Sequence, residues 1–84
     1  MADETRLKRL KIRSWRRGTK EMDLILGPFC DAEAAALPEG DLDLFEALLS
    51  ENDHDLYSWV SGKAPAPDRF APLIGRIARH AGAV

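Results

Sequence analysis

Apolar residues recur at spacings of three and four along most of this chain, and this pattern predicts α-helices. The clearest run places four apolar side chains on one helix face: Met22, Ile25, Leu26 and Phe29. Pro28 lies inside this run. Because proline removes a backbone N–H and crowds the preceding turn, we expect this helix to kink near Gly27 and to continue toward Ala36.

A basic first helix is expected over residues 5–17, because every residue there is compatible with a helix. Its apolar stripe is narrow: Leu7 and Leu10 share one face, on which the small residue Ser14 also falls. Gly18 breaks the run, and the arginines that precede it suit the negative end of the helix dipole. The first helix is therefore expected to end at this glycine.

Two short helices are predicted in the acidic middle of the chain. Pro38 suits the first turn of a helix, and the apolar spacing that follows it ends near Ser50. Asn52 or Asp53 can cap the next helix, and Gly62 is well placed just after its end. This fourth helix spans only two to three turns.

The end of the chain predicts one more helix. Residues 63–67 form a linker of proline and alanine, and the last helix is expected over residues 68–81 with Asp68 as its cap. No segment alternates β-branched and polar residues over the length of a strand. The predicted fold class is all-α: a small five-helix bundle that forms a single domain over residues 1–84.

Charge is strongly segregated along these elements. The 84 residues carry a formal net charge of −2, but eight of the twelve cations lie between Arg6 and Lys20 with no acid among them. Between Glu21 and Gly62 there are eleven acids and no lysine or arginine. The basic segment either binds an acidic partner or lies across the acidic helices of its own domain.

Residues suited to catalysis or metal binding are sparse. Cys30 is the one cysteine, which excludes an internal disulfide and a CxxC cluster, and it is expected to be a small buried hydrophobe. His54 and His80 fall on different predicted helices without metal-ligand spacing, and both are expected at the surface. The sequence thus predicts no catalytic, cofactor-binding or metal-binding residues, and no enzyme.

We expect the protein to be located in the cytoplasm. No apolar run approaches the ~20 residues that span a bilayer. The first four residues include two acids where a signal or transit peptide would be basic and apolar. We therefore expect no membrane partner.

The corner at residues 17–21 is the one place where dense charge, a helix end and a helix start coincide. In one interpretation Gly18 caps the second helix and Glu21 reaches back to the Gly18 N–H. In the other interpretation the corner is a docking surface. A simple corner could be formed by many residue types, so it does not require Arg16, Arg17 and a glycine together, and the glycine permits close approach of another backbone. The residues alone leave both open.

Arg17-Gly18-Thr19-Lys20-Glu21 resembles the RGxxE motif of the succinate dehydrogenase assembly factor family, the SdhE-like flavinators. The segment Asp53-His54-Asp55-Leu56-Tyr57-Ser58-Trp59 resembles a second block of that family. Together with the residues between them, these motifs extend the resemblance over most of the chain, from Arg13 to Gly62. Their joint spacing is far more specific than either motif alone.

The resemblance implies a five-helix fold and an assembly factor that is not an enzyme. It implies binding to the flavoprotein subunit of succinate dehydrogenase, and in some bacteria of fumarate reductase, and promotion of covalent FAD attachment to a histidine of that subunit. The factor itself would bind no cofactor, because FAD belongs to the partner, and we expect a monomer when free. The implied partner-binding residues are those of the motif, followed by a contact rim: Arg17, Gly18 and Glu21, then Arg16, Arg13, Asp53 and Asp55.

The alternative function is a nucleic-acid-binding or regulatory module that uses the basic first helix. Eight cations in fifteen residues could contact several phosphates. The acidic remainder and the lack of a recognition motif argue against nucleic acid as a partner.

Overall fold

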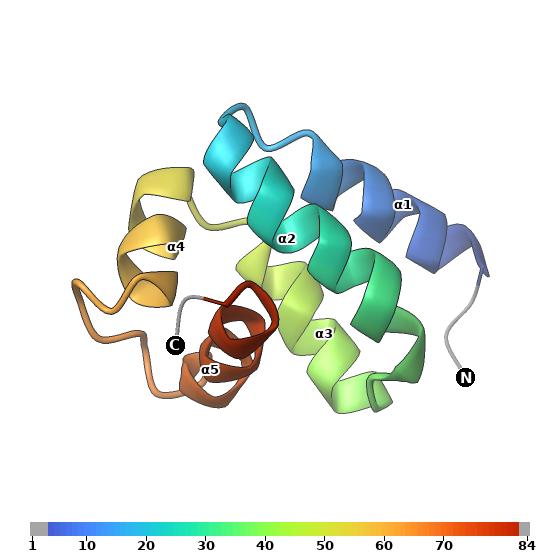
Figure 1. The fold of residues 1–84 in the computed structure, drawn as a ribbon. Helices are drawn as coiled ribbons and strands as arrows, with labels where there is room; N and C mark the ends of the chain where they lie inside the picture. Colours follow the sequence, from blue (N-terminus) through green and yellow to red (C-terminus); the bar gives the residue numbers. More distant parts are fainter. Residues whose placement is uncertain (1–3, 83–84) are drawn as a thin grey trace.

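Residues 4–82 fold into five α-helices and one 3₁₀ turn (Figure 1). In order they are α1 (Glu4–Trp15), α2 (Lys20–Glu33), η1 (Ala34–Ala36), α3 (Glu39–Leu48), α4 (Asp53–Val60) and α5 (Ala71–His80). This computed structural model describes residues 4–82, and no strand occurs within that range. The prediction of an all-α five-helix fold is confirmed.

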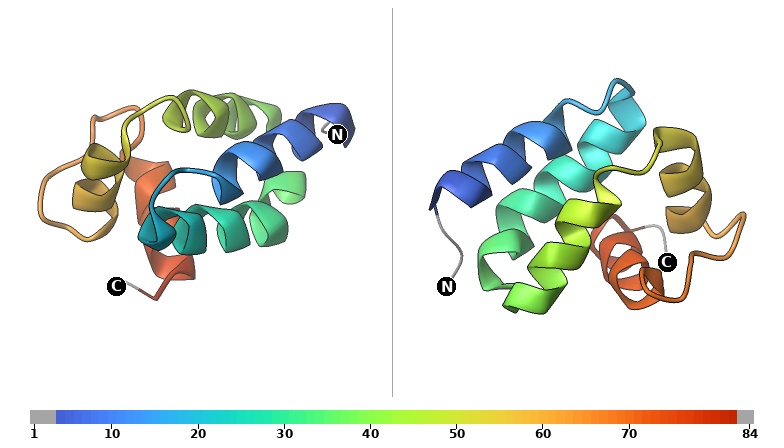
Figure 2. Two further views of the ribbon diagram at one scale, coloured as in Figure 1. Left: turned by 90° about the horizontal axis from the view of Figure 1, so that it is seen from above. Right: turned by 180° about the vertical axis from the view of Figure 1, so that it is seen from behind.

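Helix α2 occupies the middle of the fold and packs against α1, α4 and α5. It runs antiparallel beside α1 in every view (Figures 1 and 2). Every helix contributes a fully buried side chain to one continuous core, for example Leu10, Leu26, Phe29, Phe45, Leu56 and Ile77. Three of the four apolar residues that predict α2 are buried in it, and its Phe29 ring lies 5.6 Å from that of Phe45.

Pro28 does not end α2, which stays α-helical to Glu33 and then tightens into η1. The expected continuation toward Ala36 is therefore confirmed. Gly27 has a packing role that the sequence did not reveal, since a Cβ on this residue would lie only 2.4 Å from two ring carbons of Trp15. Helices α1 and α2 approach closely because one side chain is missing there.

Two helix boundaries differ from those predicted. The first helix ends at Trp15 rather than at residue 17, so Arg16 and Arg17 belong to the corner that follows. The last helix begins at Ala71 rather than at residue 68, and Asp68 is not its cap. A turn leads into it instead, in which the Pro67 carbonyl accepts hydrogen bonds from the N–H groups of Phe70 and Ala71, both at 2.9 Å.

The predicted ends of α4 are confirmed. The Asn52 side chain caps the helix by accepting a hydrogen bond from the Asp55 N–H at 2.8 Å. At the other end Gly62 follows the helix with a φ of +82°, a conformation that side chains rarely adopt.

The basic first helix lies across the acidic elements of its own domain, which confirms one of the two interpretations of its charge. Arg6 contacts two carboxylates of α3, at 2.6 Å to Asp43 and 3.0 Å to Glu46, and Lys11 lies 3.7 Å from Asp31 of α2. The hydrogen bond to Asp43 raises the pKa of the Arg6 guanidinium above its ordinary value. Asp43 and Lys11 are largely exposed, whereas the Arg6 side chain is only 21% exposed. Ion pairs with an exposed partner contribute little to stability, so these contacts mainly orient α1.

Candidate partner-binding corner

Helices α1 and α2 are joined by a tight corner whose backbone requires a glycine. Gly18 has a φ of +101°, in the region that side chains disfavour, and no atom would crowd a Cβ there. Thr19, in an extended conformation, is the cap residue of α2. The interpretation in which Gly18 caps α2 and Glu21 reaches back to its N–H is therefore wrong. Instead, Asp23 of the first turn accepts a 2.6 Å hydrogen bond from the Arg17 N–H.

The Arg17 side chain turns inward from the corner and is only 11% exposed. Its Nε donates to Asp53 Oδ1 at 2.8 Å, and its Nη2 donates to the Glu51 carbonyl at 2.5 Å. Its Nη1 donates to the carbonyl of Leu49. One guanidinium therefore ties the corner to the end of α3 and to the first turn of α4.

This arrangement satisfies groups that the helices leave unpaired. Leu49 follows the last residue of α3, where a backbone carbonyl has no partner within the helix. The positive charge beside this carbonyl also interacts favourably with the negative end of the helix dipole. Arg17 thus acts as an internal clamp, a role that sequence reasoning did not predict, and its direct contact with a partner stays a prediction.

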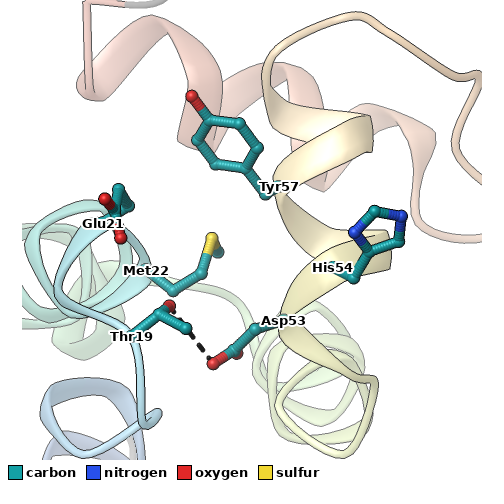
Figure 3. A pocket seen from close by; sticks show the side chains of 6 residues that line it. All are labelled: Thr19, Glu21, Met22, Asp53, His54 and Tyr57. Carbon is teal, nitrogen blue, oxygen red and sulfur yellow. Dashed lines mark hydrogen bonds between the residues drawn. The ribbon is translucent and has the colours of Figure 1, made fainter.

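Asp53, the acid that pairs with Arg17, also lines a pocket of about 360 Å³ between the start of α2 and α4 (Figure 3). Its lining residues are Thr19, Glu21, Met22, Asp53, His54 and Tyr57. Thr19 donates a 3.3 Å hydrogen bond across this space to the second oxygen of Asp53, and the Met22 side chain points into it. Asp53 therefore accepts hydrogen bonds with both oxygens: Oδ1 accepts from Arg17, and Oδ2 accepts from Thr19, the cap residue of α2.

The seven predicted partner-binding residues have different surroundings. Arg16, Gly18 and Glu21 are exposed on the corner. Within residues 4–82 the structure records no side-chain hydrogen bond or ion pair for Arg16 or Glu21. The other four engage their own chain: Arg17 and Asp53 pair with each other, while Arg13 donates to Ser50 and Asp55 accepts from Asn52.

Tyr57 is a surface residue that sequence reasoning missed. It is 41% exposed and lines the pocket opposite Glu21 (Figure 3). The core face of α4 consists of Leu56 and Val60, with Trp59 partly buried against it. Tyr57 lies off that face, so a helical projection of α4 could have identified it as an exposed aromatic residue.

In the described range, the side chains that could take part in catalysis or metal binding do not form a cluster. Cys30 is 5% exposed, and burial raises the pKa of its thiol. His54 and His80 are exposed, as predicted. Residues 4–82 contain no group of three histidine, cysteine, aspartate or glutamate side chains placed to hold a metal ion. Over the same range, none of the helices has the length and apolar character that crossing a membrane requires.

The fold and the corner define a small helical domain that presents a firmly held surface. The family model described as "Flavinator of succinate dehydrogenase" matches residues 8–81, and the chain belongs to this family. The fold and family expected from the motifs are thereby confirmed.

Individual relatives agree with the family model. The chain is 36% identical over 73 residues to the FAD assembly factor SdhE of Acetobacter pasteurianus, covering 86% of this chain and 67% of the relative. It is 35% identical over 66 residues to the protein of the same name from Vibrio cholerae, covering 77% of each. It is 41% identical over 70 residues to the mitochondrial succinate dehydrogenase assembly factor 2 of Mycosarcoma maydis, covering 83% of this chain but only 29% of the relative. The chain thus spans much less than the full length of some relatives.

Proposed function

We propose that this chain is a non-catalytic assembly factor that binds the flavoprotein subunit of succinate dehydrogenase and promotes covalent attachment of FAD to it. The family model and the printed names of the relatives support this function. FAD would be held by the partner, so this chain needs no cofactor site. We propose the flavoprotein of fumarate reductase as a second partner of the same class. The location in the cytoplasm and the monomeric state of the free protein remain predictions.

The observation that carries the proposal is the contrast between a fixed backbone and free side chains at the corner. Arg17 holds the corner by contacts with three residues of the segment from α3 to α4. Glu21 and Gly18 stay exposed beside it. A surface that is fixed before binding loses little conformational entropy on docking, which favours affinity.

The proposed mechanism is positional. A docked factor would stabilise the arrangement of the flavoprotein in which the flavin and the acceptor histidine lie in reactive contact, and such orientation can lower a barrier substantially without new chemical groups. Glu21 would accept charge-assisted hydrogen bonds from the partner, and Gly18 would allow close approach of its backbone. Arg16 would lie at the rim of the contact.

Co-expression tests this function. The flavoprotein subunit is produced with and without this chain, and the flavin that remains bound after denaturation is measured. We expect Glu21→Ala to reduce that flavin strongly. The matched control is Glu39→Ala, which removes an exposed acid from the first turn of α3. Equal flavin with and without the wild-type chain would refute the proposal.

The nucleic-acid alternative is less well supported once the first helix is seen in its place. Arg6, Arg9 and Lys11 are paired with acids of the same domain, which leaves fewer cations for phosphates. Recovery of nucleic acid that decreases steeply with salt, in a pull-down with the full chain, would nevertheless favour it.

A further inference from the structure

A second pocket, of about 310 Å³, is lined by residues of α3 and α5 and by Arg69 just before α5. Figure 1 shows where α3 and α5 lie in the fold. Three arginines line the pocket: Arg69, Arg76 and Arg79. The apolar part of its wall comes from Leu44, Pro72 and Leu73, and the single acid in it is Asp41. Its volume is at the lower end of the range of about 300–1,000 Å³ typical of small-molecule sites.

The Arg79 guanidinium lies back along α5 rather than beyond its C-terminal end. A Cβ on Gly75 would be 3.5 Å from Nη1 of Arg79, so the guanidinium covers the preceding turn of the helix. An arginine that only complemented the helix dipole would lie near the last carbonyls. Arg79 lines the pocket from this position.

The other two arginines are held in place by their neighbours. Nε and Nη2 of Arg76 donate to Glu33 Oε1 at 3.3 and 3.0 Å, which fixes that guanidinium and leaves Nη1 without this contact. The Arg69 guanidinium lies 4.3 Å from the centre of the Phe70 ring. Within residues 4–82 no carboxylate lies within ion-pair distance of Arg69 or Arg79. The pocket thus keeps positive charge that is not neutralised locally.

We propose that this pocket binds the phosphate group of a small organic phosphate ester. Guanidinium groups match phosphate oxygens in geometry as well as in charge, and several of them can share one phosphate. The apolar residues beside them would contact the organic part of the ester. Asp41 opposes an anion, so it should weaken binding and favour ligands whose phosphate lies on the arginine side. This proposal is independent of the function proposed for the corner.

Titration of the isotope-labelled full chain, followed by nuclear magnetic resonance at constant ionic strength, tests the proposal. The probes are phenyl phosphate, inorganic phosphate and sodium chloride. We expect saturable shifts of the Nε–H signals of all three pocket arginines with phenyl phosphate. Inorganic phosphate should bind at least about threefold more weakly, because it lacks contact with the apolar wall. Equal affinities, or shifts that chloride reproduces, would overturn the proposal.

Variants locate the binding site. Arg79→Gln should weaken phenyl phosphate at least about fivefold, since it removes one charge-assisted contact. Asp41→Asn should tighten binding by removing the opposing charge. The matched control is Arg16→Gln, which removes an exposed arginine from the corner and should leave the affinity unchanged. A loss from Arg16→Gln as large as that from Arg79→Gln would show nonspecific attraction and overturn the assignment.

Discussion

The Arg17 guanidinium and the Asp53 carboxylate form an ion pair of 2.8 Å that joins the corner to the first turn of α4. Both side chains are mostly buried, at 11% and 17% exposed. Arg17→Ala would remove the donor to Asp53 Oδ1 and to two backbone carbonyls. We therefore expect it to lower the free energy of unfolding by about 2–4 kcal/mol, measured by urea denaturation.

From the sequence, Arg17 is expected only to bind the partner, whereas its contacts in the fold give it a part in stability as well. Arg16→Ala is the matched control, because Arg16 is exposed and its change should alter the unfolding free energy little. An Arg17→Ala variant as stable as the control would show that the clamp contributes nothing to the fold.

Gly27→Ala is expected to destabilise the packing of α1 on α2. The added Cβ would lie 2.4 Å from ring carbons of Trp15, so the helices must separate, at a cost of about 1–3 kcal/mol. In a Trp15→Ala background the same change should be stabilising, by up to about 1 kcal/mol, because alanine is the better helix former. The four variants of this double-mutant cycle are compared by thermal unfolding, and an unchanged sign would contradict the assigned contact.

The Cys30 thiol is expected to react slowly with alkylating reagents in the folded protein. Burial raises its pKa, so little thiolate forms near neutral pH, and the side chain is also shielded. Since the raised pKa favours the neutral thiol in the fold, its contribution to stability is complete below the ordinary thiol pKa. That contribution is lost as the pH rises through the higher pKa of the folded state.

The measurement is the alkylation rate with iodoacetamide between pH 7 and pH 10, in native buffer and in guanidinium chloride. The native rate should be much lower and should rise at higher pH than the denatured rate. Equal rates in both conditions would show that Cys30 is accessible in the folded state.

The core and the charge pairing of α1 could be predicted because they depend on periodicity. The spacing of Met22, Leu26 and Phe29 defines the face of α2 that the fold buries. Likewise, a cation-rich first helix followed by a long segment that holds only acids favours contact between the two, which is one of the two interpretations that the sequence leaves open. Patterns of this kind can be read from the sequence because they do not depend on how individual side chains pack.

The contacts that define the corner could not be predicted in the same way. The partners of the Arg17 side chain lie 32 to 36 positions away, and only the placement of α4 beside α2 brings them together. A motif that marks Arg17 cannot say whether its donors face inward or outward. The space that Gly27 leaves for Trp15 depends in the same way on two helices whose approach has no local signal.

Gly18 offers a test that separates strain from docking. With a φ of +101°, any side chain at this position costs about 1–2 kcal/mol, and nothing lies within 4 Å of the added Cβ. Gly18→Ala and Gly18→Arg should therefore lose similar stability while keeping their helices. If the partner approaches this backbone closely, the two variants should differ in function.

We expect Gly18→Ala to retain most of the covalent flavin formed on co-expression with the flavoprotein subunit, and Gly18→Arg to retain little. The arginine side chain would extend from the corner into the space that the partner must occupy. Thermal unfolding of both variants provides the control for stability. Equal loss of flavin in the two, in proportion to their loss of stability, would show that Gly18 serves only the turn and that the partner docks elsewhere.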